Sequence, residues 1–169
     1  MKTRLYLLGI FLFIVATAVK AQEVSMKDGK YTASKVYVVE GLDCSQIYNI
    51  IKNYPYLSGD GELISFTPEN NSVILKVGRE WEKDPMGRIV PLCVKAACLI
   101  KENKLKIVLY SFHKEIHASM DRNSRILEVS IDKAVFSDSE KQKLNDYVKN
   151  IFDDIDNLIN CMKEEYLFH

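Results

Sequence analysis

Two histidines, His113 and His117, are the first side chains in this sequence whose type and spacing could bind a metal. They are four residues apart and would share a face in either a helix or a strand. Metal sites in proteins need three or four ligands in a suitable geometry. The nearest acid, Glu115, is expected to point to the other face of a strand. The pattern therefore favours solvated histidines on an edge strand, and we predict no metal site.

Three acids, Asp153, Asp154 and Asp156, form the other cluster that could do chemistry. They fall outside the apolar stripe of the expected C-terminal helix, which places them on its solvated face. Catalytic carboxylates need a pocket that shifts their pKa, and a calcium loop of the usual kind needs a glycine that is missing here. No P-loop, GxGxxG, GxSxG or HExxH motif occurs. The sequence therefore predicts no enzyme, no cofactor and no catalytic residues.

The four cysteines, Cys44, Cys93, Cys98 and Cys161, match no zinc-site or CxxC spacing. Cys93 and Cys98 would lie about 16 Å apart along an extended strand and point to opposite faces, so they cannot form a disulfide with each other. Cys44 and Cys98 both point to the expected core, which makes Cys44–Cys98 the least strained pair, with Cys161 as a competitor. Buried free thiols are the alternative, and the sequence leaves both open.

Residues 1–21 have the pattern of a secretory signal peptide. Lys2 and Arg4 precede an almost wholly apolar run over residues 5–19, and Val19-Lys20-Ala21 fits a cleavage site. A membrane anchor is the alternative, but a run of about 15 residues is shorter than the ~20 that a spanning helix needs. We expect export to the periplasm or cell envelope of a Gram-negative-type bacterium, with no transmembrane segment after cleavage.

The remaining 148 of the 169 residues suit one domain with a core of its own. We expect residues 22–34, which are polar, to be a flexible leader, and residues 35–169 to be a single α+β domain. The whole chain has 23 basic and 23 acidic residues, of which three basic and no acidic ones fall in residues 1–21, so the rest has a net charge of −3. A slightly acidic domain lacks the basic surface that nucleic-acid binding requires, and we predict no nucleic-acid partner.

Hydrophobic periodicity predicts an antiparallel sheet with two helices. Asp43 and Gln46 have capping-box spacing for a first helix that ends at Pro55, and either Ser137 with Glu140 or Ser139 with Gln142 offers the same for a long C-terminal helix of about 25 residues. The expected order is β-α-β-β-β-β, with one more short strand before the last helix. The strands fall at residues 36–39, 63–67, 73–81, 89–100, 105–113 and 127–131.

The alternation of side chains along these strands predicts which face of the sheet the helices cover. The apolar even positions of the strand at 88–100 should meet the helices. The opposite face should be polar, yet it also carries apolar residues, and such a patch is typical of a contact surface. Residues 114–138 could instead fold back and cover it, and the sequence leaves this open. The proposed interaction surface consists of Ile89, Leu99, Val108, Tyr110 and Phe112.

Two segments resemble a known group of domains. Residues 35–42, Lys35-Val36-Tyr37-Val38-Val39-Glu40-Gly41-Leu42, run into the helix at 46–54. The strand pair Ala97–Ile100 and Leu105–Tyr110 is joined by Lys101-Glu102-Asn103-Lys104. In this order of elements the chain resembles exported bacterial domains of unknown function with a TATA-box-binding-protein-like (TBP-like) fold. The resemblance implies that fold and an exported location, with no activity and no catalytic residues to carry over.

These observations together predict a non-enzymatic binding or assembly module of the bacterial envelope. Its partner would be an unknown protein or a second copy of the chain, bound to the second apolar face of the sheet. The alternative is a carrier that holds a small apolar ligand or lipid in a cavity between the long helix and the sheet.

Overall fold

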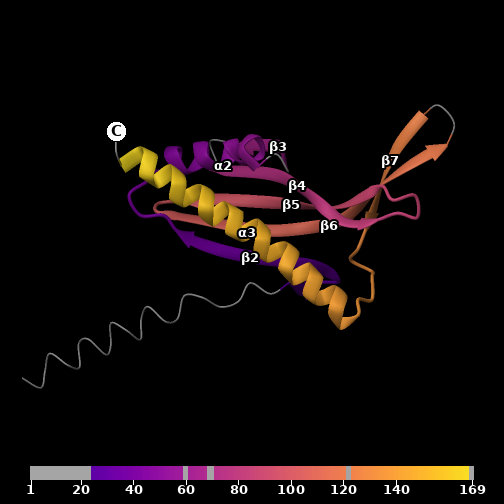
Figure 1. Ribbon diagram of the computed structural model, residues 1–169. Coiled ribbons are helices and arrows are strands. Elements are labelled where there is room, and N and C mark those ends of the chain that lie inside the picture. The colour runs from indigo at the N-terminus through magenta and orange to yellow at the C-terminus, as the bar shows by residue number, and fades with distance from the viewer. Residues whose placement is uncertain (1–23, 59–60, 68–70, 121–122, 168–169) are drawn as a thin grey trace, which may run out of the picture.

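The computed structural model describes residues 24–58, 61–67, 71–120 and 123–167, and it contains one antiparallel sheet with two helices on one face (Figure 1). The spatial order of the strands is β1-β2-β6-β5-β4-β3, and β7 pairs with β6. The predicted α+β class is confirmed. The strands are β1 (Ser25–Lys27), β2 (Lys30–Val38), β3 (Gly61–Thr67), β4 (Ser72–Lys83), β5 (Ile89–Lys101), β6 (Lys104–Met120) and β7 (Asn123–Ser130).

Both helices begin at the caps that the sequence predicts. Helix α2 (Cys44–Ser58) follows Asp43, whose carboxylate accepts from the Gln46 backbone N–H at 2.8 Å, while the Gln46 side chain accepts from the Asp43 N–H at 2.8 Å. Helix α3 (Asp138–Leu167) follows Ser137, whose N–H donates to Glu140 at 2.8 Å. These reciprocal bonds satisfy backbone donors that have no partner inside a helix.

The core lies between the sheet and the helices, as the alternation predicts. Helix α3 crosses the sheet diagonally, and α2 lies beside its C-terminal half (Figure 1). The Tyr147 hydroxyl donates to the Leu92 carbonyl at 2.6 Å, and the Tyr37 hydroxyl donates to the Phe152 carbonyl at 3.1 Å, which ties α3 to the sheet. The inward side chains of the three central strands are buried: Val73, Leu75, Val77, Val90, Leu92, Val94, Ala96, Cys98, Ile100, Leu105, Ile107 and Leu109.

The prediction that residues 22–34 form a flexible leader is wrong for the described part of that range. Residues 25–34 form the hairpin of β1 and β2, joined by Asp28 and Gly29. Both residues have positive φ, 51° and 72°, as a two-residue type I′ turn requires. The Tyr31 N–H also donates to the Asp132 carboxylate at 3.0 Å. An Asp-Gly pair between two short strands is typical of a β-hairpin. The prediction of a leader relied on the polar composition of the segment and did not use this pair.

The prediction that the first helix ends at Pro55 is also wrong, because α2 continues to Ser58. Pro55 is buried in the last turn of the helix. Its Cα and Cβ lie so close to Gly61 of β3 that a Cβ on that glycine would be 3.3 Å from both. This packing against the sheet accounts for a proline inside the helix, because tertiary contacts can override local propensity.

The predicted signal peptide, residues 1–21, lies outside the described residues. Among the helices within the described ranges, none is both long enough and apolar enough to cross a bilayer.

The β1–β2 turn gives a test of the N-terminal hairpin. Replacement Gly29→Ala should lower the free energy of unfolding by about 1 kcal/mol, because a left-handed conformation is costly for a residue with a Cβ. Steric clash is not the cause, since a Cβ there would meet no atom within 4 Å. Urea denaturation measures the change, with Lys30→Ala as the control. An unchanged midpoint for Gly29→Ala would mean that this segment does not contribute to the fold.

Candidate functional site

The outer face of the sheet, which is the face away from the helices, is not covered by any described segment. The question left open by the sequence was whether residues 114–138 fold back over it. They do not: β7 pairs with the last part of β6, His113–Met120, to form an arm that extends beyond the other strands (Figure 1). The chain then returns to the helix side, where Ile131 and Phe136 are buried. The outer face is therefore available as a contact surface.

One end of this face carries five apolar side chains, which we call the apolar patch: Val36, Val38, Leu99, Val108 and Tyr110. Of the predicted members, Leu99 is 45% exposed, and Val108 and Tyr110 are half-buried. Val36 and Val38 of β2 are 57% and 62% exposed. They join the patch because β2 pairs with β6, placing Val36 opposite Lys106. That long-range pairing carries no local signal in the sequence.

The fourth predicted residue, Ile89, lies apart from the patch. It is 53% exposed, but it pairs with Lys83 at the far end of the β4–β5 hairpin. It therefore does not contribute to the same surface as Leu99.

Lysine side chains lie between and beside the members of the apolar patch. Lys106 lies opposite Leu99, and Lys95 lies opposite Tyr110. Lys104 lies opposite Val38. Within the described residues none of these three lysines forms an ion pair, whereas Lys76, further along the face, is paired with Glu115. This end of the outer face is therefore apolar and positively charged.

The fifth predicted residue, Phe112, is not on the outer face, and that prediction is wrong. Phe112 is 0% exposed and belongs to the core. The pairing of β5 with β6 shifts between Lys95↔Tyr110 and Cys93↔His113, so that Ser111 and Phe112 together lie opposite the single residue Val94. Ser111 has a φ of 57°. This β-bulge inserts one residue and reverses the alternation of every side chain that follows it.

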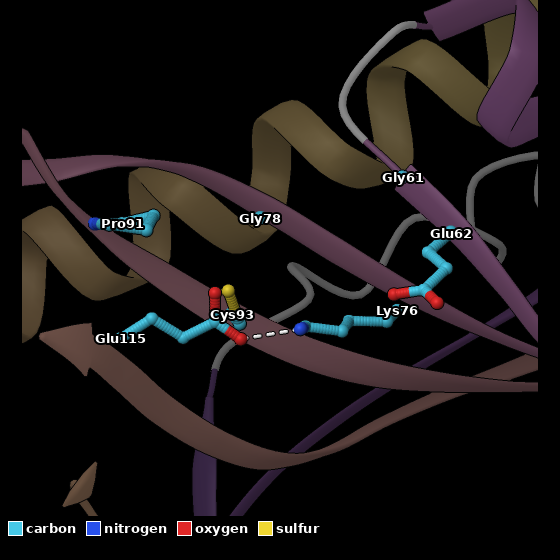
Figure 2. Close-up of a pocket in the computed structure, with 7 residues that line it drawn as sticks. All are labelled: Gly61, Glu62, Lys76, Gly78, Pro91, Cys93 and Glu115. Atoms are coloured by element: carbon cyan, nitrogen blue, oxygen red, sulfur yellow. Dashed lines mark ion pairs between the residues drawn. The ribbon is translucent and has the colours of Figure 1, made fainter. Parts of the chain in front are cut away.

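The other end of the outer face holds an open pocket of about 300 Å³. Figure 2 shows Glu62 of β3, Lys76 of β4 and Glu115 of β6 converging on it, with Cys93 of β5 beside Glu115. Gly78 leaves room for the thiol, because a Cβ at this position would be only 2.8 Å from the Cys93 Sγ. The remaining lining residues are Gly61 and Pro91.

His113 completes a group of potential ligands at this pocket. Its side chain is buried, and the ligand atoms of His113, Cys93 and Glu115 all lie within 4.8 Å of one another. The His113 Nδ1 is 2.9 Å from the Ser111 carbonyl oxygen, which can only accept, so Nδ1 carries the proton. Among the residues that the structure describes, the buried His113 Nε2 has no hydrogen-bond partner; it lies 3.7 Å from Glu115 and 3.9 Å from Glu128.

The charges of this group are set by burial and by Lys76. Burial raises the pKa of the Cys93 thiol to about 11, and the negative charge of Glu115 acts in the same direction. Burial also tends to raise the pKa of the Glu115 carboxyl, but its hydrogen bond and ion pair with Lys76 outweigh this and hold the pKa below its usual value. At neutral pH the group therefore contains a neutral thiol beside an ionised carboxylate.

The sequence analysis missed this group for two reasons. Residues two apart in a strand share a face, so the expectation that Glu115 points away from the histidines was wrong. His113 was also expected on a solvated strand, whereas the bulge at Ser111 moves it to the outer face beside Cys93, where β5, β6 and the base of the arm bury it. His117 is exposed in the arm and takes no part in the group.

All four cysteines are free thiols, so the predicted Cys44–Cys98 disulfide is not formed. Cys44 lies at the start of α2, in a second pocket of about 420 Å³ that also includes Asn103 of the β5–β6 turn. Cys98 is fully buried within β5, opposite Ile107 of β6. Both residues are on the helix side of the sheet, as expected. Cys44, however, lies beyond the end of the strands, next to the β5–β6 turn, whereas Cys98 lies within β5.

Comparison with known proteins identifies the fold. No known family model matches the sequence, and no curated protein matches it. A TBP-like protein from Parabacteroides distasonis ATCC 8503 has a TM-score of 0.58 and 14% sequence identity, over 81% of this chain and 97% of that one. The chain has a TBP-like fold. A DUF4468 family protein from Bacteroides ovatus ATCC 8483 gives a TM-score of 0.59 and 13% identity, over 86% of this chain and 94% of that one.

At these identities the likeness establishes the TBP-like fold and nothing about activity. The predicted resemblance to bacterial domains of unknown function with this fold is confirmed. Both solved structures come from bacteria, which is compatible with the expected source of the chain.

The bulge predicts different responses from two neighbouring aromatic residues. Phe112→Ala should lower the free energy of unfolding by about 3–5 kcal/mol, because it leaves a cavity in the core. Tyr110→Ala should cost much less, because its side chain is half-buried on the outer face. Chemical denaturation of the two variants measures the difference. Equal losses, or a larger loss for Tyr110→Ala, would contradict the assignment of faces.

Proposed function

We propose that this chain is an exported, non-enzymatic binding module of the bacterial envelope, whose outer sheet face holds an acidic and apolar segment of a partner protein. The observation that carries the proposal is the apolar patch, which no described segment covers and which is interleaved with lysines. Contiguous exposed apolar side chains are unfavourable in water and are typical of interaction sites. Export is part of the proposal, and it is supported by the signal-peptide pattern of residues 1–21.

The lysines indicate the chemistry of the partner. Lys95, Lys104 and Lys106 have no ion-pair partner among the described residues, so acidic side chains on a ligand could approach them without breaking existing pairs. Opposite charges across an interface increase association rates and exclude wrong partners. An extended segment that alternates acidic and apolar residues would match a face on which lysines and aliphatic side chains alternate.

A second copy of this chain is a poor match for the same face. A two-fold dimer through the outer face would place the same patch on both sides of the interface. Lys95, Lys104 and Lys106 of both copies would then lie in one interface, and so high a concentration of like charge is unfavourable. We therefore propose a different protein as the partner.

The carrier alternative has no comparable support. The space between α3 and the sheet is filled by core side chains such as Val148, Ile151 and Phe152, which are fully buried. The two pockets described above lie on the outer face and at the start of α2. Neither lies between the long helix and the sheet, where the alternative would require a ligand.

Selection from a displayed random-peptide library tests the proposal. The wild-type protein should enrich peptides that combine Asp or Glu with aliphatic or aromatic residues. The double variant Lys104→Glu/Lys106→Glu should lose this enrichment, because it reverses the charge next to the patch. Lys133→Glu/Lys149→Glu makes the same change in net charge at exposed positions away from the outer face and should leave the enrichment unchanged. Equal enrichment by both double variants would contradict the proposal.

Light scattering during size-exclusion chromatography tests the choice of partner. We expect the wild-type protein to be a monomer, and Tyr110→Glu to remain a folded monomer. A wild-type dimer that becomes a folded monomer in Tyr110→Glu would instead assign the outer face to self-association.

A further inference from the structure

We propose that Cys93, His113 and Glu115 form a binding site for a zinc-class transition-metal ion at the pocket end of the outer face. The site goes beyond the proposed partner binding and does not depend on it. Three observations carry it: the convergence of three different ligand types, the buried and unpartnered nitrogen of His113, and an open pocket beside them.

The geometry of the three ligand atoms is close to what a single ion needs. The Cys93 Sγ, a ring nitrogen of His113 and a Glu115 carboxylate oxygen lie within 4.8 Å of one another, on the adjacent strands β5 and β6. In a tetrahedral site, ligands at about 2.0–2.3 Å from zinc are separated from each other by roughly 3–4 Å. The His113 Nε2 and the Glu115 oxygen are already 3.7 Å apart. Small side-chain adjustments would therefore complete the site.

The burial and orientation of His113 favour a role as a metal ligand over a role as a solvated surface residue. Its side chain is 5% exposed, so its polar atoms need partners within the protein. The Nδ1–H donates to the Ser111 carbonyl, so Nε2 is the ring nitrogen that can bind a metal when the imidazole is neutral. Metal-binding histidines commonly make this kind of bond from the other ring nitrogen, since it fixes the tautomer and the orientation of the ring. A metal on Nε2 would satisfy an atom that has no hydrogen-bond partner among the described residues.

The type of ligand indicates the type of metal. Thiolate and imidazole ligands suit zinc and related transition metals, whereas calcium and magnesium prefer oxygen alone. The thiolate and the carboxylate would balance the two positive charges of the ion. Three protein ligands leave a fourth position for water. Cys93 and Glu115 line the open pocket, which provides a route for the ion.

Lys76 is the group that competes with a cation here, because it is paired with Glu115. Lys76 also interacts electrostatically with a second acid, Glu62. This residue lies opposite Lys76 on β3, and both side chains line the pocket (Figure 2). Lys76 can therefore transfer its charge pairing to Glu62 when Glu115 binds a metal. Glu128 of β7, 3.9 Å from the His113 Nε2, adds further negative charge on the arm side.

A catalytic role for Cys93 would explain this arrangement of residues less well than a metal site does. A nucleophilic cysteine needs an accessible thiolate and a lowered pKa. Cys93 is buried, and its pKa is raised. A bound metal would offset the cost of ionising the buried thiol, because it bonds directly to the thiolate.

Titration of the purified, metal-free protein with Co²⁺ tests the site, because a cobalt–thiolate bond gives a near-ultraviolet charge-transfer band. The wild-type protein should bind one equivalent and show this band. Cys93→Ser should lose the band, and His113→Gln should lose stoichiometric uptake, with circular dichroism confirming that both are folded. The matched controls Cys161→Ser and His117→Gln change exposed residues outside the group and should bind as the wild type does.

Two results of this titration would overturn the proposal. One is a folded wild-type protein that takes up no Co²⁺. The other is a charge-transfer band that persists in Cys93→Ser and disappears in Cys161→Ser, which would mean adventitious binding to an exposed thiol.

The pH dependence of uptake gives a second test with a defined sign. The thiol must release one proton when it binds the metal, whereas Glu115 is already ionised. Because burial raises the pKa of Cys93 to about 11, affinity should rise about tenfold per pH unit between about pH 7 and 8. The other charged groups that face the site are Lys76, whose raised pKa keeps it protonated in this range, and the acids Glu62 and Glu128. An affinity that does not change with pH would exclude Cys93 as a ligand.

Discussion

The β-bulge at Ser111 determines what each face of this sheet presents. One extra residue in β6 turns Phe112 into the core and turns His113 and Glu115 toward the outer face. The left-handed conformation of Ser111 costs on the order of 1–3 kcal/mol. Burial of the Phe112 ring contributes roughly 1.5–3 kcal/mol, and the hydrogen bond from His113 to the Ser111 carbonyl adds about 1 kcal/mol. These terms are similar in size, so the bulge depends on both contacts.

The bulge also divides the outer face into two chemically distinct ends. Before it, β6 continues the regular alternation, and Val108 and Tyr110 join Leu99 in an apolar patch bordered by lysines. After it, His113 and Glu115 meet Cys93 and Lys76 at a polar pocket. We therefore propose two separate binding functions on one face, a partner segment at the first end and a metal ion at the second. Neither involves the helices, whose role is to bury the inner face.

Much of the fold could be predicted from local pattern, and the site could not. The inward strand positions and the caps at Asp43 and Ser137 follow from alternation and from residue type at fixed spacing. The bulge has no such signal, because Ser111 is neither the glycine nor the asparagine that usually marks positive φ. The assignment of Phe112 to the outer face was therefore wrong. The pairing of β2 with β6 is a contact distant in sequence, which no local pattern reveals.

Nuclear Overhauser contacts around residues 110–115 test the bulge at Ser111. We expect contacts from the Phe112 ring to the methyl groups of Val94 in the core, and from the His113 ring to the β-protons of Cys93 on the outer face. Contacts from the Phe112 ring to the β-protons of Cys93 or to the Tyr110 ring, with His113 turned to the helix side, would mean regular alternation through Ser111. That result would contradict both the assignment of faces and the metal site.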